Sequence, residues 1–349
     1  MKITIEKSAI PILWLDTAVL IKMAKQRTGE QIGEPDASRV ATLYETIYRL
    51  TRQQRLLCPA GDQREEYELG DRLVEAIQDL QDQLSLGIEF QHRQGVEDAQ
   101  IPKAIRDYIE GVQAIQLSYR DGFLEDPVPE AQRLGDFYIV VPRASSREMI
   151  DRRRATGKVV RVEWEKLRAQ NVADKVPFEM QREREYAGAL EGHVHHLRRL
   201  AQRQAAGQDP TPDEFLAAQI IGTYLAVWKR RGGQPPELEG LEQFFRSPQF
   251  RDLPAQELQA NVLAKLLTSP NPIQSGDSMD VQMLSTVLPF CDLIVTDQKM
   301  KTILCDLGAD RRYQVQIFAL RDYDALMQAL SEVGPQGPAE AKVGPTDTS

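Results

Sequence analysis

Two apolar runs near the ends of this 349-residue chain each stop at an acidic residue. Residues 10–15 (IPILWL) lead directly into Asp16, and residues 293–296 (LIVT) lead directly into Asp297. Runs this short and this uniformly apolar are typical of strands in a parallel sheet that is covered on both faces. Because ligand sites in such sheets form at the carboxyl ends of the strands, we expect both carboxylates at the same edge.

Two further pairs of acidic residues stand at the starts of expected helices. Asp277 and Asp280 lie three positions apart, which places both on one face of a first helical turn. Glu65 and Glu66 lie in the first turns of the helix expected after residues 55–60 (RLLCPA). Taken singly, each acid is more simply explained as a helix cap or a turn former. Together with the two strand-end acids, they indicate a carboxylate cluster.

The chemistry of such a cluster points to a bound cation. Carboxylates within a few ångströms of one another raise one another's pKa values, which is costly unless a cation lies between them. A hard ion with oxygen ligands, Mg²⁺ or Mn²⁺, is the natural occupant. Such an ion can lower the pKa of a bound water and stabilise negative charge on a phosphodiester in the transition state. The pattern therefore favours metal-dependent hydrolysis of phosphodiesters.

The elements that would position these acids alternate between strands and helices. We expect strands at 10–15, 55–60, 292–297 and 313–320. The helices expected between and after them cover residues 17–27, 36–50, 61–84, 277–290, 298–308 and 321–333. This order is typical of an α/β fold whose parallel sheet has helical crossovers.

The middle of the chain differs in character from its ends. Residues 85–270 are charged and mostly helical in pattern, with strand-like pieces at 136–144 and 158–164. The last residues, 334–349, are rich in Pro, Gly and small polar residues, which predicts disorder. We therefore divide the chain into an N-terminal part (1–84), a mostly helical insertion (85–270), a C-terminal part (271–333) and the disordered tail.

Charge and composition permit an anionic partner without identifying one. The net charge is −9, yet basic residues gather at 152–161, 195–203 and 229–231. Each basic cluster alone is more simply a solvated helix face. No run reaches the ~18 apolar residues of a membrane span, the charged pair Glu6 and Lys7 interrupts any leader, and the three cysteines lack metal-ligand spacing. We expect a cytoplasmic protein that has no membrane partner.

Both ends of the chain resemble the PIN domain family. The segment ILWLDTAVLI (12–21) is similar to that family's first strand, aspartate and following helix. The segment DSMDVQMLSTVLPFCDLIVTDQKM (277–300) resembles its later helix and strand, which ends in Thr-Asp before a short basic stretch. The segment VQIFALRDYDALMQAL (315–330) resembles its last strand and helix. The similar regions cover roughly residues 9–80 and 275–332.

The resemblance implies a Rossmann-like, three-layer fold and a metal-dependent nuclease that acts on RNA more often than on DNA. It implies Asp16, Asp280 and Asp297 as Mg²⁺ or Mn²⁺ ligands, with Asp277 as an alternative or additional ligand to Asp280. It also implies a fourth acid after the second strand, either Glu65 or Glu66. The chain departs from the family pattern at Ala18, where the family often has Asn, and in the long stretch before Asp280.

We predict a nuclease in which these acids are catalytic and Thr296, Lys299 and Arg64 contact the substrate. The insertion is expected to cover the site and to contact the substrate backbone or a protein partner. Two alternatives stay open at this point. One is a PIN-like scaffold that binds RNA or protein without turnover, and the other is the toxin ribonuclease of a toxin–antitoxin pair.

Overall fold

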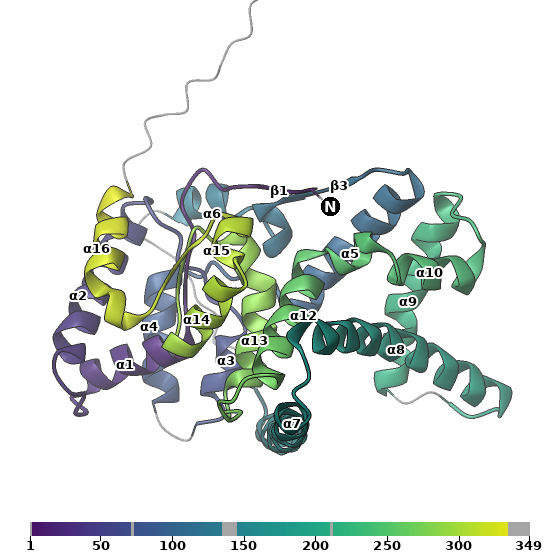
Figure 1. Ribbon diagram of the computed structural model, residues 1–349. Helices are drawn as coiled ribbons and strands as arrows, with labels where there is room; N and C mark the ends of the chain where they lie inside the picture. The colour runs from purple at the N-terminus through teal and green to yellow at the C-terminus, as the bar shows by residue number, and fades with distance from the viewer. Residues whose placement is uncertain (1, 71–72, 135–144, 210–211, 334–349) are drawn as a thin grey trace, which may run out of the picture.

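The computed structural model describes residues 2–70, 73–134, 145–209 and 212–333 (Figure 1). About 66% of the chain is helical, and the strands form two small parallel sheets. The expected α/β class is therefore confirmed at this level. No helix in the described ranges is long and apolar enough to cross a membrane.

The larger sheet has three parallel strands in the order β2–β4–β5. Their bounds are β2 (Leu13–Leu15), β4 (Leu293–Val295) and β5 (Gln316–Phe318). Leu15 lies opposite Val295, and Val295 lies opposite Phe318. Because the strands are parallel and in register, the residues that follow all three leave the sheet at the same edge. Three of the strands expected from the sequence are confirmed, although each is shorter than its apolar run.

Alternate side chains of this sheet enter two different apolar clusters. Leu13 and Leu15 belong to one cluster, while Trp14 and Ile294 belong to the other. Burial on both faces explains why the strand sequences are apolar without alternation. The first cluster is covered by α1 (Thr17–Thr28), α2 (Asp36–Arg52), α4 (Val74–Ser85) and α16 (Tyr323–Glu332). The second is covered by α12 (Pro254–Leu267), α13 (Asp277–Val287), α14 (Gln298–Asp306) and α15 (Ala309–Tyr313).

The middle of the chain is mainly helical, as predicted, and Figure 1 shows α8, α9 and α10 on the side of the molecule away from α1, α2 and α16. Besides α12, its helices are α5 (Arg93–Ile109), α6 (Pro127–Leu134), α7 (Arg147–Ala173), α8 (Phe178–Ala205), α9 (Pro212–Arg230), α10 (Glu237–Phe245) and α11 (Pro248–Arg251). The apolar cluster that contains Trp14 also contains Phe90 and Val262, so this segment shares a core with the chain ends.

The second sheet joins the N-terminus to the middle of the chain. β1 (Lys2–Glu6) pairs in parallel with β3 (Ala114–Ser118). Short helical turns complete the elements: α3 (Gln63–Tyr67), η1 (Tyr119–Gly122), η2 (Leu288–Phe290) and η3 (Leu320–Asp322).

Two sequence-based expectations are wrong. Residues 55–60 form no strand of the sheet, because only Leu57 makes a parallel bridge to Ile12, and Pro59 has no N–H to continue a ladder. Residues 158–164 lie inside α7 and are not strand-like. The Arg, Lys, Glu and Ala residues around them are strong helix formers, and they outweigh the weak strand preference of the valines.

Other expectations are modified or fall outside the described ranges. The helix expected at 61–84 is divided into α3 and α4, and Leu73 between them has a left-handed φ of 63°. The strand expected at 136–144 and the tail at 334–349 lie outside the residues that the structure describes.

Candidate functional site

Asp16 lies at the junction of β2 and α1 and is held there by two hydrogen bonds. Its Oδ1 accepts from the backbone N–H of Ala18 at 2.9 Å, and its Oδ2 accepts from the Thr296 hydroxyl at 2.6 Å. The side chain caps α1 and is only 3% exposed. Burial raises the pKa of Asp16, and the nearby Asp297 charge adds to that effect. Thr296, predicted to contact substrate, is buried and orients this carboxylate.

Asp297 lies at the equivalent junction on the neighbouring strand. It follows β4 after Thr296 and caps α14, where its Oδ1 accepts from the backbone N–H of Met300 at 2.9 Å. The parallel pairing of β2 and β4 places this junction beside that of Asp16. The two acids predicted from strand-end position are therefore neighbours at one edge of the sheet.

Glu66 on α3 faces these strand-end acids. Burial raises its pKa to about 7, and the charges of Asp16 and Asp297 act in the same direction. Its contact with the Thr17 hydroxyl lowers the pKa in part, although Glu66 Oε2 and Thr17 Oγ1 make no hydrogen bond of regular geometry. A carboxylate oxygen that loses water and gains no donor is unfavourable, so this position suits an additional positive partner.

Asp280 on the first turn of α13 completes the group. It is buried, and its pKa is raised well above the usual range by burial first and then by the charges of Asp16, Glu66, Asp297 and Asp277. The bare backbone of Gly276 leaves room between two of these carboxylates. A Cβ at that position would lie 3.2 Å from Glu66 Oε1 and 3.6 Å from Asp280 Oδ2.

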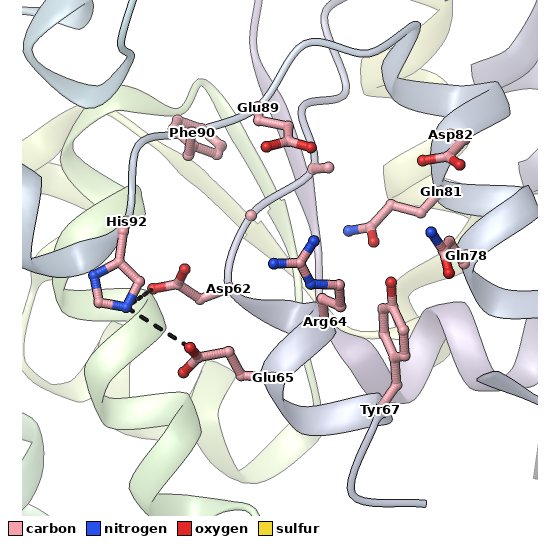
Figure 2. A pocket seen from close by; sticks show the side chains of 12 residues that line it. Asp62, Arg64, Glu65, Tyr67, Gln78, Gln81, Asp82, Glu89, Phe90 and His92 are labelled. Carbon is pink, nitrogen blue, oxygen red and sulfur yellow. Dashed lines mark ion pairs between the residues drawn. The ribbon is translucent and has the colours of Figure 1, made fainter. Parts of the chain in front are cut away.

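Glu65, the other glutamate predicted at this position, faces away from the cluster. It forms ion pairs with Arg93 at 2.8 Å and Arg153 at 2.6 Å. His92 Nε2 lies 3.8 Å from Glu65 Oε1, and a dashed line marks this pair in Figure 2. Burial alone would raise the pKa of Glu65, but the hydrogen bonds from His92 and Arg93 and the charge of Arg153 outweigh it and lower the pKa to about 2. Glu65 is thus already neutralised by the protein's own cations.

Asp277 is also neutralised within the protein. Its Oδ2 accepts from Lys299 Nζ at 2.6 Å and from the backbone N–H of Gln274 at 2.7 Å. The Asp277 side chain is almost fully buried in this pairing. Lys299, predicted as a substrate contact, is therefore engaged with Asp277, and Asp280 is the acid of this helix that faces the cluster.

Arg64, the third predicted substrate contact, lies in a different place. It lines a polar cavity of about 120 Å³ with Tyr67, Gln81 and Glu89, and Figure 2 shows these side chains pointing into it. Arg64 also lies 3.7 Å from Glu68 on the same helix. The structure therefore separates Arg64 from the acid cluster.

Sequence reasoning missed two contributions to the site. Gly276 leaves space between two carboxylates, and its only sequence signal was its position just before the acidic helix start. The basic run 152–161 includes Arg153 and Arg154, which bind Glu65 and the Leu69 carbonyl instead of a partner. Their partners lie more than 80 residues away in the chain, which no local pattern reveals.

Neither the arrangement of potential metal ligands nor a comparison with known proteins identifies a metal site in this protein. Among the residues that the structure describes, no three His, Cys, Asp or Glu side chains form a group already arranged to hold a metal ion. Comparison of the chain with known protein families, curated proteins and solved structures found no match. What remains is a set of four acids, of which Asp16 and Asp280 are buried and Glu66 and Asp297 half-buried, and none of the described lysines or arginines forms an ion pair with them.

Proposed function

We propose that the chain is a PIN-like, divalent-metal-dependent nuclease in which Asp16, Glu66, Asp280 and Asp297 hold the ion. The observation that carries this proposal is geometric: Asp16 and Asp297 follow paired strands, and the backbone of Gly276 lies close to both Glu66 and Asp280, in keeping with the raised pKa of Asp280. These acids come from four separate segments, so their meeting is a property of the fold. A buried cluster of like charges opposes folding, and a bound cation removes that cost.

The donor set fits Mg²⁺ or Mn²⁺. All four side chains offer carboxylate oxygens, which are the ligands that these hard ions prefer. Glu66 Oε2 makes no hydrogen bond of regular geometry, and Glu66 Oε1 lies where a Cβ at Gly276 would be 3.2 Å away. By contrast, Glu65 and Asp277 already pair with arginine or lysine and have no comparable need for an ion.

The protein's own residues have distinct tasks in the proposed reaction. Thr296 fixes the orientation of Asp16, and the capping bond from Met300 fixes Asp297. The Asp277–Lys299 pair anchors the start of α13 and so positions Asp280. The bound ion would supply Lewis acidity, which activates a water nucleophile and offsets the charge that develops on the phosphoryl group. The burial of Asp16 and Asp280 lowers the local dielectric and so strengthens the interaction of these carboxylates with an ion.

RNA is the favoured substrate because the PIN resemblance implies it. One alternative keeps support: a PIN-like scaffold that binds RNA or a protein partner without turnover. It is favoured by the lack, in the described part of the chain, of acids already arranged as a metal group. The toxin alternative is disfavoured because residues 85–270 make the chain far longer than a compact toxin.

The proposal is tested by cleavage of labelled RNA and DNA strands of one sequence, in Mg²⁺, Mn²⁺ or EDTA. We expect RNA cleavage with either ion and none with EDTA. Asp280→Asn should lower the rate by on the order of 100-fold or more, because a ligand to the ion is lost. Arg64→Gln, which changes a side chain in the separate cavity, serves as the matched control. Metal-independent cleavage, or equal rates for Asp280→Asn and wild type, would overturn the proposal, and binding without cleavage would favour the scaffold.

A further inference from the structure

A second cavity opens at the same edge of the sheet as the acid cluster. It has a volume of about 280 Å³, and its walls come from the segments that follow all three central strands. Ala18 lies after β2, Asp297 after β4 and Arg321 after β5. Thr296 and Asp297 belong both to this cavity and to the acid cluster. A ligand in the cavity therefore lies directly beside the proposed metal site.

The cavity differs from the acid cluster in its charge. Its charged lining consists of three cations, Lys22, Arg39 and Arg321, and two carboxylates, Asp36 and Asp297. Lys22 pairs with Asp36 at 2.6 Å, which leaves the two arginines as the available cations. In the described ranges, neither arginine forms an ion pair with a carboxylate. This edge of the sheet thus places a cationic surface next to an anionic one.

The surroundings of the two arginines favour anion binding. The Arg39 guanidinium lies over the Tyr323 ring at 5.5 Å, a contact that orients the group and leaves its N–H donors at the edge. Arg321 is exposed next to Asp322, but Asp322 is already bound by Lys301 at 2.6 Å and by the backbone N–H of Ala319 at 2.8 Å. Planar guanidinium groups bind phosphate through paired hydrogen bonds.

We propose that this cavity binds a phosphate group of the nucleic-acid strand and so positions the neighbouring linkage at the acid cluster. The inference rests on the proposed nuclease function and adds a substrate-positioning site to it. A volume of about 280 Å³ is at the lower limit of ligand pockets, which suits a phosphate with part of one nucleotide. The phosphate is either internal to the strand or a terminal monophosphate, since both offer the same oxygens to Arg39 and Arg321.

The test measures binding and does not depend on cleavage. Fluorescence anisotropy with a 3′-labelled ten-nucleotide RNA, in EDTA, compares wild type with Arg39→Gln/Arg321→Gln. The control Lys25→Gln/Arg311→Gln removes two cations that do not line the cavity. We expect the cavity variant to bind at least about 10-fold more weakly, because charged hydrogen bonds to phosphate are lost. The slope of log K against log salt should fall by about 1.4, that is about 0.7 for each lost contact to a single strand. The control should stay within about twofold of wild type, because exposed charges outside a contact surface contribute little.

Each outcome bears on one proposal separately. If the cavity variant binds like wild type, the phosphate site is wrong, even where wild type cleaves RNA. If wild type fails to cleave but only the cavity variant loses binding, the phosphate site holds and the nuclease proposal fails. Comparing an RNA that has a 5′-phosphate with one that has a 5′-hydroxyl identifies the source of the phosphate. A site for a terminal monophosphate binds the first RNA more tightly, whereas a site for an internal phosphate binds both equally. Should the double variant not fold, Arg321→Gln alone changes an exposed residue, and an unchanged salt slope for it would overturn the inference.

Discussion

Two adjacent glutamates on α3 should respond in opposite ways to the same substitution. Glu65→Gln breaks ion pairs with Arg93 and Arg153, at 2.8 Å and 2.6 Å. Glu66→Gln removes a half-buried carboxylate whose Oε2 makes no hydrogen bond of regular geometry. The two substitutions are chemically identical and one residue apart, so each serves as the control for the other.

The stability effects follow from these contacts. Hydrogen bonds between charged groups contribute roughly 1.5–3 kcal/mol each, and partial exposure of both arginines reduces this. Glu65→Gln should therefore lower the free energy of unfolding by about 2 kcal/mol, or about 3 °C in Tm. Glu66→Gln should leave the metal-free protein unchanged or up to about 1 kcal/mol more stable, because it removes an unsatisfied buried charge.

Stabilisation by Mn²⁺ should be lost in Glu66→Gln and retained in Glu65→Gln. An ion at 100 times its Kd stabilises the folded state by about 2.7 kcal/mol. If loss of the Glu66 carboxylate weakens binding 100-fold, only about 0.4 kcal/mol of that remains. Glu65→Gln should keep the full effect, because the Glu65 side chain faces Arg93 and Arg153 and not the other acids.

The assay is thermal unfolding of wild type and both variants, each in EDTA and in Mn²⁺. The reasoning predicts a lower Tm in EDTA for Glu65→Gln and a lost Mn²⁺ shift for Glu66→Gln. It is refuted if Glu65→Gln loses the Mn²⁺ shift while Glu66→Gln retains it. Equal shifts in all three proteins would refute it as well.

Two further predictions concern single side chains. Thr296→Val removes the 2.6 Å hydrogen bond to Asp16, so it should lower the free energy of unfolding by about 1–2 kcal/mol and Mn²⁺ affinity by about 10–100-fold. The control Thr302→Val changes an exposed threonine and should alter neither the free energy of unfolding nor the Mn²⁺ affinity measured by calorimetry. Equal effects of the two variants would contradict the role of Thr296 in orienting Asp16. Burial raises the pKa of Glu97 to about 7 from 4.5, so stability is lost as pH rises between these values. In denaturant titrations at pH 8, Glu97→Gln should be more stable than wild type. The gain is at most about 3 kcal/mol and is reduced by the partial exposure of the side chain. At pH 4 the two proteins should be equally stable.

The positions of two central strands and of the acids that follow them could be predicted from the sequence, because a local pattern of apolar residues determines them. Uninterrupted apolar runs revealed β2 and β4, because both faces of the sheet are buried. Asp16 and Asp297 followed from the common edge of parallel strands. The strand predicted at 55–60 was wrong because a pattern of apolar residues does not show that Pro59 lacks the N–H needed for a sheet ladder.

The choice between neighbouring acids was not predictable from the sequence. Glu65 and Glu66 differ only by about 100° of rotation around α3, and what separates them is the distant Arg93 and Arg153. Asp277 is separated from Asp280 in the same way by Lys299, a residue of the next helix. Such partners are set by tertiary packing and leave no signature in local spacing.

The most direct test of the central claim is the location of Mn²⁺ in crystals of this protein by anomalous scattering. We expect a peak bounded by Asp16, Glu66, Asp280 and Asp297. A peak elsewhere, for example beside Glu65, or no peak at saturating Mn²⁺, would contradict it.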